Sequence, residues 1–124
     1  MRQEIVIDDR HRVVTDEPES LGGEDMAPTP LDLLAAALAG CVVTTIRMFA
    51  RRQGWPLDEV AADVSLDTSV RPARCAITVR LPQGLSETQW RRLEYVAKAC
   101  AVHRALERGI EFEHSTVLAA TTAV

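Results

Sequence analysis

Alternating apolar and polar residues predict four strands in the first two thirds of the chain. Residues 4–8 (EIVID) and a short segment around residues 12–15 predict a hairpin, since a charged turn separates them. Residues 59–66 (EVAADVSL) and 74–81 (RCAITVRL) alternate over a longer stretch and predict an antiparallel pair with one face on a core. The side chains expected on that face are Val60, Ala62, Val64, Leu66, Cys75, Ile77, Val79 and Leu81.

A long helix is predicted between these two pairs, at about residues 30–53. Thr29 is a suitable N-cap, Pro30 suits the first helical position, and Asp32 can complete a capping box. Gly54, followed by Trp and Pro, is a typical stop signal.

This helix is unusually apolar, because the fourteen positions from 33 to 46 carry no charge. Apolar residues on every side are typical of a helix that is buried all round. A chain of 124 residues buries only roughly two thirds of its unfolded surface, so we expect a partner surface as well as its own sheet. Dimerisation is therefore an early expectation.

The remaining segments complete one domain over residues 1–124. Residues 15–30 are rich in proline, glycine and acidic residues, which predicts a loop that could form a lid or rim. A second helix is expected to begin at Ser86, where SETQ forms a capping box. The segment AVHRALER predicts a short helix that ends at Gly109, and residues 110–114 (IEFEH) predict a last strand. The order β-β-α-β-β-α-α-β is an α+β fold whose long helix packs on an antiparallel sheet.

Charge and composition narrow the function. A formal net charge of −4 argues against nucleic acid, and the paired arginines at 51–52 and 91–92 are more simply solvated helix faces. The opening MRQEIVIDDR lacks an apolar signal core, and the uncharged run at 33–46 is too short to span a bilayer. We therefore expect a cytoplasmic protein without a membrane partner.

Three cysteines in such a chain are core residues or reactive ones, because the cytosol keeps thiols reduced. Strand parity places Cys75 in the core. Cys41 and Cys100 lie on apolar faces of helices that must share one core, so their thiols could approach each other, although either could simply be a buried cysteine. His103 and Arg104 follow Cys100 within one turn, and positive groups near a thiol favour the thiolate.

A metal site would be the competing use of these residues. Cys41, Cys100 and His103 would supply three ligands, but no C-x-x-C or H-x-x-x-H pair anchors them. Phosphate-binding and dinucleotide-binding glycine motifs are missing from the sequence as well. We expect neither a metal nor a bound cofactor.

Three segments resemble the OsmC/Ohr family, the osmotically inducible and organic hydroperoxide resistance proteins. Residues 30–57 (PLDLLAAALAGCVVTTIRMFARRQGWPL) resemble its first cysteine motif. Residues 100–106 (CAVHRAL) resemble its second, which is usually C-P-V-H-R-T-L. The loop DEPESLGGEDMAPTP resembles the D-E-P…G-G…P-x-P segment of the OsmC-like branch.

The resemblance implies an intertwined homodimer with two long cysteine helices at its centre, acting as a thiol peroxidase. Cys41 would attack the peroxide and become a sulfenic acid, and Cys100 would resolve it as a disulfide. A thiol reductant, such as a dithiol or a lipoyl-type group, would reopen the disulfide. Organic or fatty-acid hydroperoxides are the expected substrates, since an apolar helix suits an alkyl chain.

Two departures concern the groups that would stabilise the thiolate. The hydroperoxidase branch has a glutamate ten residues before the cysteine, where this chain has Leu31. Asp32 is the nearest carboxylate, but it lies about 180° from Cys41 around a straight helix, so capping is its better role. The family arginine comes from the N-terminal strands, where Arg10 and Arg12 are both available; Arg12 begins the apolar segment RVV and is preferred.

Ala101 replaces the family's usual proline after the second cysteine, which we expect to loosen the helix break there. The alternative to an enzyme is a non-catalytic OsmC-like dimer that is stress-associated or binds a small molecule. A third possibility, a plain α+β domain with three core cysteines, would require a stable monomer.

Overall fold

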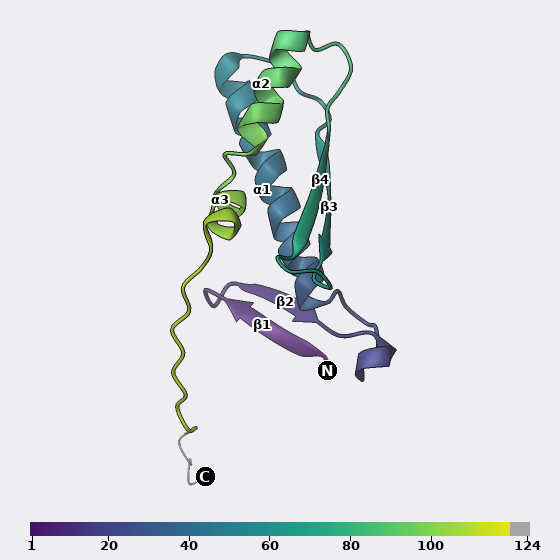
Figure 1. The fold of residues 1–124 in the computed structure, drawn as a ribbon, viewed down its shortest axis with the longest axis vertical. Coiled ribbons are helices and arrows are strands. Elements are labelled where there is room, and N and C mark those ends of the chain that lie inside the picture. Colours follow the sequence, from purple (N-terminus) through teal and green to yellow (C-terminus); the bar gives the residue numbers. More distant parts are fainter. Residues whose placement is uncertain (120–124) are drawn as a thin grey trace.

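The computed structural model describes residues 1–119 and has a long central helix as its axis (Figure 1). Its elements are β1 (Gln3–Ile7), β2 (His11–Thr15), the 3-10 turn η1 (Glu19–Leu21), α1 (Pro30–Gln53), β3 (Ala61–Asp67), β4 (Arg74–Arg80), α2 (Glu87–Ala97) and α3 (Ala101–Arg108). The β3–β4 pair lies along one side of α1, and α1 also packs against α2 and α3. The predicted α+β class and the order of the first seven elements are confirmed.

The bounds of α1 follow from the local chemistry that the sequence predicts. The Thr29 hydroxyl accepts a hydrogen bond from the Asp32 backbone N–H at 3.1 Å, and the Asp32 carboxylate accepts one from the Thr29 N–H at 3.0 Å. Gly54 ends the helix with φ +72°, a left-handed conformation that costs glycine little. Asp32 is therefore a capping residue of α1.

The core lies on one stripe of α1 and not all round it. The buried α1 residues recur every four positions and pack with residues of β3, α2 and α3. They are Leu38, Val42, Ile46 and Ala50, in contact with Val60, Leu93, Ala97 and Cys100. Leu31 and Leu34 are 48% and 37% exposed, so the chain's own elements cover only part of the apolar section of α1. Burial on every side stays a prediction that requires the expected partner surface.

By length and composition α1 could also cross a membrane. The core helix of a soluble protein meets the same test, so this property is weak evidence for a span. The packing of α1 against β3, α2 and α3 accounts for its apolar stripe without a bilayer.

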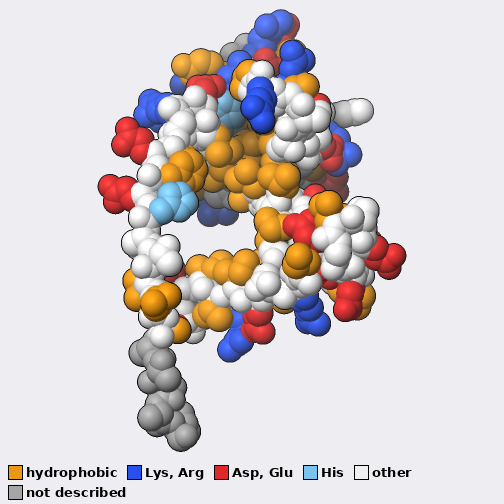
Figure 2. All heavy atoms as spheres, turned by 60° about the horizontal axis from the view of Figure 1, so that its bottom comes forward, with side chains coloured by type: hydrophobic (Ala, Val, Ile, Leu, Met, Phe, Trp, Pro, Cys, Tyr) orange, Lys and Arg blue, Asp and Glu red, His pale blue; other side chains and the backbone are white. Residues whose placement is uncertain are grey.

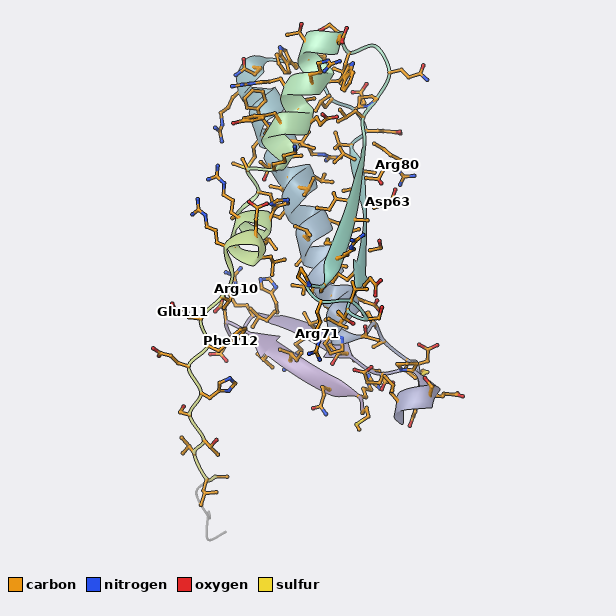
Figure 3. The ribbon with its side chains drawn as sticks, viewed as in Figure 1. Arg10, Asp63, Arg71, Arg80, Glu111 and Phe112 are labelled. Atoms are coloured by element: carbon orange, nitrogen blue, oxygen red, sulfur yellow. The ribbon has the colours of Figure 1, made fainter. Side chains whose placement is uncertain are left out.

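The strands form two separate two-stranded antiparallel sheets, β1–β2 and β3–β4. In the second sheet Val64 pairs with Ile77 and Leu66 with Cys75, which confirms the predicted parity. The outer face carries the ion pair Arg80–Asp63 at 3.2 Å (Figure 3). Cys75 nevertheless is exposed, so its predicted core position is wrong: it lies where the sheet borders a groove instead of packed side chains.

The predicted last strand at residues 110–114 is also wrong, because residues 109–119 form no strand. The segment leaves α3 as an extended tail on which Phe112 is 75% exposed (Figure 3). Alternating residues make a strand only where another strand supplies hydrogen-bond partners, and the described chain brings none to this segment.

The loop between β2 and α1 is organised by a buried carboxylate. Asp16 is only 1% exposed and accepts hydrogen bonds from the backbone N–H groups of Glu17, Glu24 and Met26 at 2.8, 3.2 and 3.2 Å. The bond from Glu17 has the largest part in holding the pKa of Asp16 below its usual value. At Gly23 a Cβ would lie 1.9 Å from the Glu17 carbonyl oxygen, so only glycine fits. The lid or rim role of this loop stays a prediction.

Candidate active site

Cys41 and Cys100 come together at the N-terminus of α3. Cys41 is half-buried on α1, one position before the core residue Val42, and Cys100 is completely buried between α2 and α3. Cys100 is the N-cap of α3, and its sulfur accepts a hydrogen bond from the backbone N–H of His103 at 3.4 Å. Both thiols are free, as the predicted mechanism requires of its starting state.

The environment of Cys41 favours its thiolate. Burial by itself raises the pKa of Cys41, but the neighbouring Cys100 thiol and the backbone N–H groups of Val102 and Ala101 outweigh it and lower the pKa below the ordinary value. The Thr45 hydroxyl makes a further, smaller contribution, and it also donates to the Cys41 carbonyl oxygen at 2.8 Å. The donors at the start of α3 belong to the positive end of a helix dipole, so they suit a negative sulfur.

The environment of Cys100 has the opposite effect. Burial raises the pKa of the Cys100 thiol, and the neighbouring Cys41 sulfur raises it further because it favours the protonated form of Cys100. The backbone N–H groups of His103 and Val102 offset this only in part. The two adjacent sulfurs are thus made unequal, because the pKa of Cys41 is lowered and the pKa of Cys100 is raised.

The helix break before Cys100 does not need the proline that Ala101 replaces. Cys100 has φ −58° and ψ 135°, which is incompatible with a continuous helix, and its thiol caps α3. The break is therefore present with alanine at position 101, and the expectation that alanine loosens it stays a prediction. The substitution also supplies a backbone N–H, which proline would lack, at the position that faces Cys41.

His103 lies in the first turn of α3 with only 24% of its side chain exposed. Its Nδ1 is 3.9 Å from a carboxylate oxygen of Glu107, too far for a hydrogen bond. Within residues 1–119, this Nδ1 is a buried side-chain atom without a hydrogen-bond partner. Such atoms are uncommon in folded proteins and call for an explanation.

Asp32 and Arg12 are engaged elsewhere in the chain. The Asp32 carboxylate is bonded to the Thr29 backbone at the start of α1. Arg12 lies on β2 with 71% of its side chain exposed and forms an ion pair with Glu4 of β1. The role of Arg12 beside the thiolate stays a prediction.

A cavity of about 780 Å³ lies next to the thiols, between α1, β4 and α2. Most of its lining is apolar, including Val42, Ile77, Val79 and Trp90, and Lys98 and His103 add polar atoms. Cys41 is not among the lining residues, so the cavity adjoins the thiol site through Val42 and His103. In the described part of the chain, no three histidine, cysteine or acidic side chains gather as a metal-binding set.

Sequence reasoning missed the main donors to Cys41, which are backbone N–H groups of α3. The pattern C-A-V-H has the spacing of a capping box, so it could have placed Cys100 at the start of that helix with free N–H groups beside it. Thr45 was missed too, although its i+4 spacing from Cys41 puts both on one face of α1.

Comparisons with known proteins identify the family and the fold of the chain. The family model described as OsmC-like protein matches residues 22–115. No functionally curated protein matches the sequence. Several solved structures do.

A Psychrobacter arcticus protein described as an osmotic stress induced and detoxification response protein is 27% identical, with a TM-score of 0.68 over 83% of this chain and 78% of that one. The organic hydroperoxide resistance protein OsmC from Legionella pneumophila is 25% identical, with a TM-score of 0.59 over 86% and 87% of the two chains. An OsmC-like protein from Mycoplasma pneumoniae, 17% identical with a TM-score of 0.66 over 86% of each chain, shares the fold.

Proposed function

This chain belongs to the OsmC-like protein family, and we propose that it reduces organic hydroperoxides with Cys41 and Cys100. The observation that carries the proposal is the unequal pair of thiols at the N-terminus of α3, with the pKa of Cys41 lowered and that of Cys100 raised. The hydroperoxide resistance neighbour from Legionella pneumophila supports a redox or stress role of the same kind.

The proposed reaction follows from the two thiol states. The Cys41 thiolate attacks the terminal oxygen of the hydroperoxide, the O–O bond breaks, and the alkoxide takes a proton to leave as an alcohol. Cys41 is then a sulfenic acid, which the Cys100 sulfur attacks. A disulfide forms and the sulfenic oxygen leaves as water, so Cys41 escapes further oxidation.

The disulfide must then be reopened by thiol–disulfide exchange with an external dithiol, of which a lipoyl-type group is one kind. No bound cofactor takes part in this scheme. The apolar cavity beside the thiols supports a substrate with an alkyl chain, including a fatty-acid hydroperoxide.

We propose further that the protein is an intertwined homodimer in the cytoplasm. Hydrophobic side chains gather on both sides of the opening between the core and the β1–β2 hairpin (Figure 2). Large apolar residues are exposed on the hairpin, on α1 and on the tail, including Ile5, Leu34 and Phe112. A second copy that covered these surfaces would remove them from water, whereas monomeric proteins rarely expose such extensive apolar surface. Light scattering of the protein as it elutes from a size-exclusion column should give the mass of two chains. A folded monomer would contradict the dimer.

The direct test is a titration of the fully reduced protein with cumene hydroperoxide, followed by mass spectrometry. The matched background is Cys75→Ser, since exposed Cys75 could react without being part of the site. We expect one Cys41–Cys100 disulfide per chain and one cumyl alcohol per peroxide. Persistence of both free thiols under excess peroxide would contradict the enzyme and favour a non-catalytic small-molecule-binding protein, which the cavity also suits.

A further inference from the structure

The starts of α1 and α2 show how this chain closes a helix N-terminus. In α1 the Thr29 hydroxyl accepts from the backbone N–H of Asp32, and the Asp32 side chain accepts in return from the Thr29 N–H. In α2 Ser86 and Gln89 make the same two bonds, at 3.1 and 2.9 Å. In both boxes the side chain of the third helical residue lies back against the capping residue.

The start of α3 has the first of these bonds and lacks the second. Cys100 stands at the capping position and accepts from the backbone N–H of His103, the third helical residue. The His103 side chain does not close the box, and its Nδ1 has no hydrogen-bond partner within residues 1–119. An imidazole with an unused nitrogen therefore stands at the third helical position of α3, and its Nδ1 lies 3.9 Å from a carboxylate oxygen of Glu107.

Cys100 needs a proton acceptor in the chemistry proposed above. Its thiol is completely buried, so bulk water has no direct access to the proton that it must lose as the disulfide forms. His103 is in the same turn, is only partly exposed, and borders the cavity of about 780 Å³. An imidazole can take a proton on one side and release it on the other.

We propose that His103 accepts the proton of the Cys100 thiol as Cys100 attacks Cys41, an inference that rests on the proposed resolving step. The Cys100 S–H bond breaks and its proton moves to His103 as the S–S bond forms. The S–O bond of the Cys41 sulfenic acid breaks, and the departing hydroxide takes the proton from the imidazolium to become water. Charge and atoms balance, and His103 returns to its neutral form.

Few charged groups surround His103 on the elements packed against it. Glu107 of α3 has a carboxylate oxygen 3.9 Å from Nδ1 and can stabilise the imidazolium in its brief lifetime. The other titratable groups that border the same cavities or the thiol site are Cys41 of α1, Cys75 of β4, Glu94 of α2 and Lys98, which follows the last residue of α2.

The test isolates the resolving step from peroxide chemistry. In a Cys75→Ser background, reduced protein is mixed with one equivalent of 5,5′-dithiobis(2-nitrobenzoate), and thionitrobenzoate is followed by its absorbance. The first release reports attack by Cys41, and the second reports attack by Cys100 on the mixed disulfide. His103→Gln should slow the second phase by about 100-fold, the lower range for loss of a general base, and leave the first phase nearly unchanged.

The pH profile separates proton transfer from a structural role. The second phase of the parent protein should show a titration step that His103→Gln and His103→Asn both lack. His114→Gln, which changes an exposed histidine of the tail, is the matched control and should behave as the parent. With cumene hydroperoxide, the His103 variants should accumulate a dimedone-reactive sulfenic acid.

A second phase of unchanged rate and pH profile in folded His103→Gln or His103→Asn would overturn the inference. Failure of the proposed peroxidase looks different, because peroxide would then leave both thiols intact in the parent protein. The His103-dependent second phase would still be seen in that case and would support the proton transfer by itself.

Discussion

The starts of α1 and α3 have the same backbone arrangement and carry different atoms. At α1 a hydroxyl caps the helix and a carboxylate closes the return bond, so the backbone N–H groups of Thr29 and Asp32 both have side-chain partners. At α3 a thiol caps the helix, the return bond is missing, and a second thiol from α1 receives the free N–H groups of Ala101 and Val102.

This difference shows what replacing one cap oxygen with sulfur can achieve. Thr29 and Asp32 satisfy the orphan N–H groups of α1 internally, which stabilises the helix and leaves nothing for another ligand. The Cys100 sulfur accepts from the third helical residue just as the Thr29 hydroxyl does, and the N–H groups of Ala101 and Val102, the first two residues of α3, are directed at Cys41. One helix start is therefore expected to matter for stability and the other for thiol chemistry.

Loss of Cys41 should have the largest effect. Cys41→Ser removes the sulfur that receives the α3 donors, so peroxide consumption in the presence of a dithiol should fall to the background rate of the buffer. Cys75→Ser, the matched cysteine change on β4, should consume cumene hydroperoxide as the unmodified protein does. Equal loss in both variants would show that the α3 site is not the reacting one.

Cys100→Ser should separate capping from resolution. Serine is a good N-cap, so α3 and the free energy of unfolding should be kept. Without a resolving thiol, Cys41 should proceed under excess peroxide from sulfenic to sulfinic acid, which mass spectrometry detects. If the Cys100→Ser variant still formed a disulfide within the chain and reduced peroxide repeatedly, another thiol would have to resolve Cys41.

A change at the α1 cap should have a smaller effect, and one on stability alone. Thr29→Ala removes the oxygen cap and should lower the free energy of unfolding by about 1 kcal/mol in urea denaturation. The alkylation rate of Cys41 should stay as it was, because the Thr29–Asp32 box does not supply its donors. A marked change in that rate would instead connect Asp32 with the thiolate.

Local patterns in the sequence predicted much of the fold. The capping residues Thr29 and Ser86 predicted the starts of two helices correctly. The period-two alternation correctly predicted which residues of β3 and β4 share one face of the sheet. Burial depends on distant surfaces, which explains the errors. Cys75 has the right parity and yet is exposed, and residues 110–114 alternate without a strand beside them.

The candidate site was predictable to the same extent. Two apolar helices with one cysteine each suggested that Cys41 and Cys100 share a core, and the structure brings them together. The donors to Cys41 are backbone groups of Ala101 and Val102, which side-chain chemistry cannot reveal. The sequence therefore pointed to charged side chains as the groups that stabilise the Cys41 thiolate, whereas in the structure the N-terminus of α3 has that role.

The most direct measurement is the pH dependence of alkylation at each thiol. The pH at which each iodoacetamide rate is half-maximal, resolved by peptide mass spectrometry in a Cys75→Ser background, reports the pKa of that thiol whether its sulfur is exposed or buried. The α3 site predicts that Cys41 titrates below the ordinary value of an unperturbed cysteine and that Cys100 titrates above it. A Cys41 that titrates at or above that value, or one that titrates no lower than Cys100, would contradict a nucleophile prepared by the start of α3.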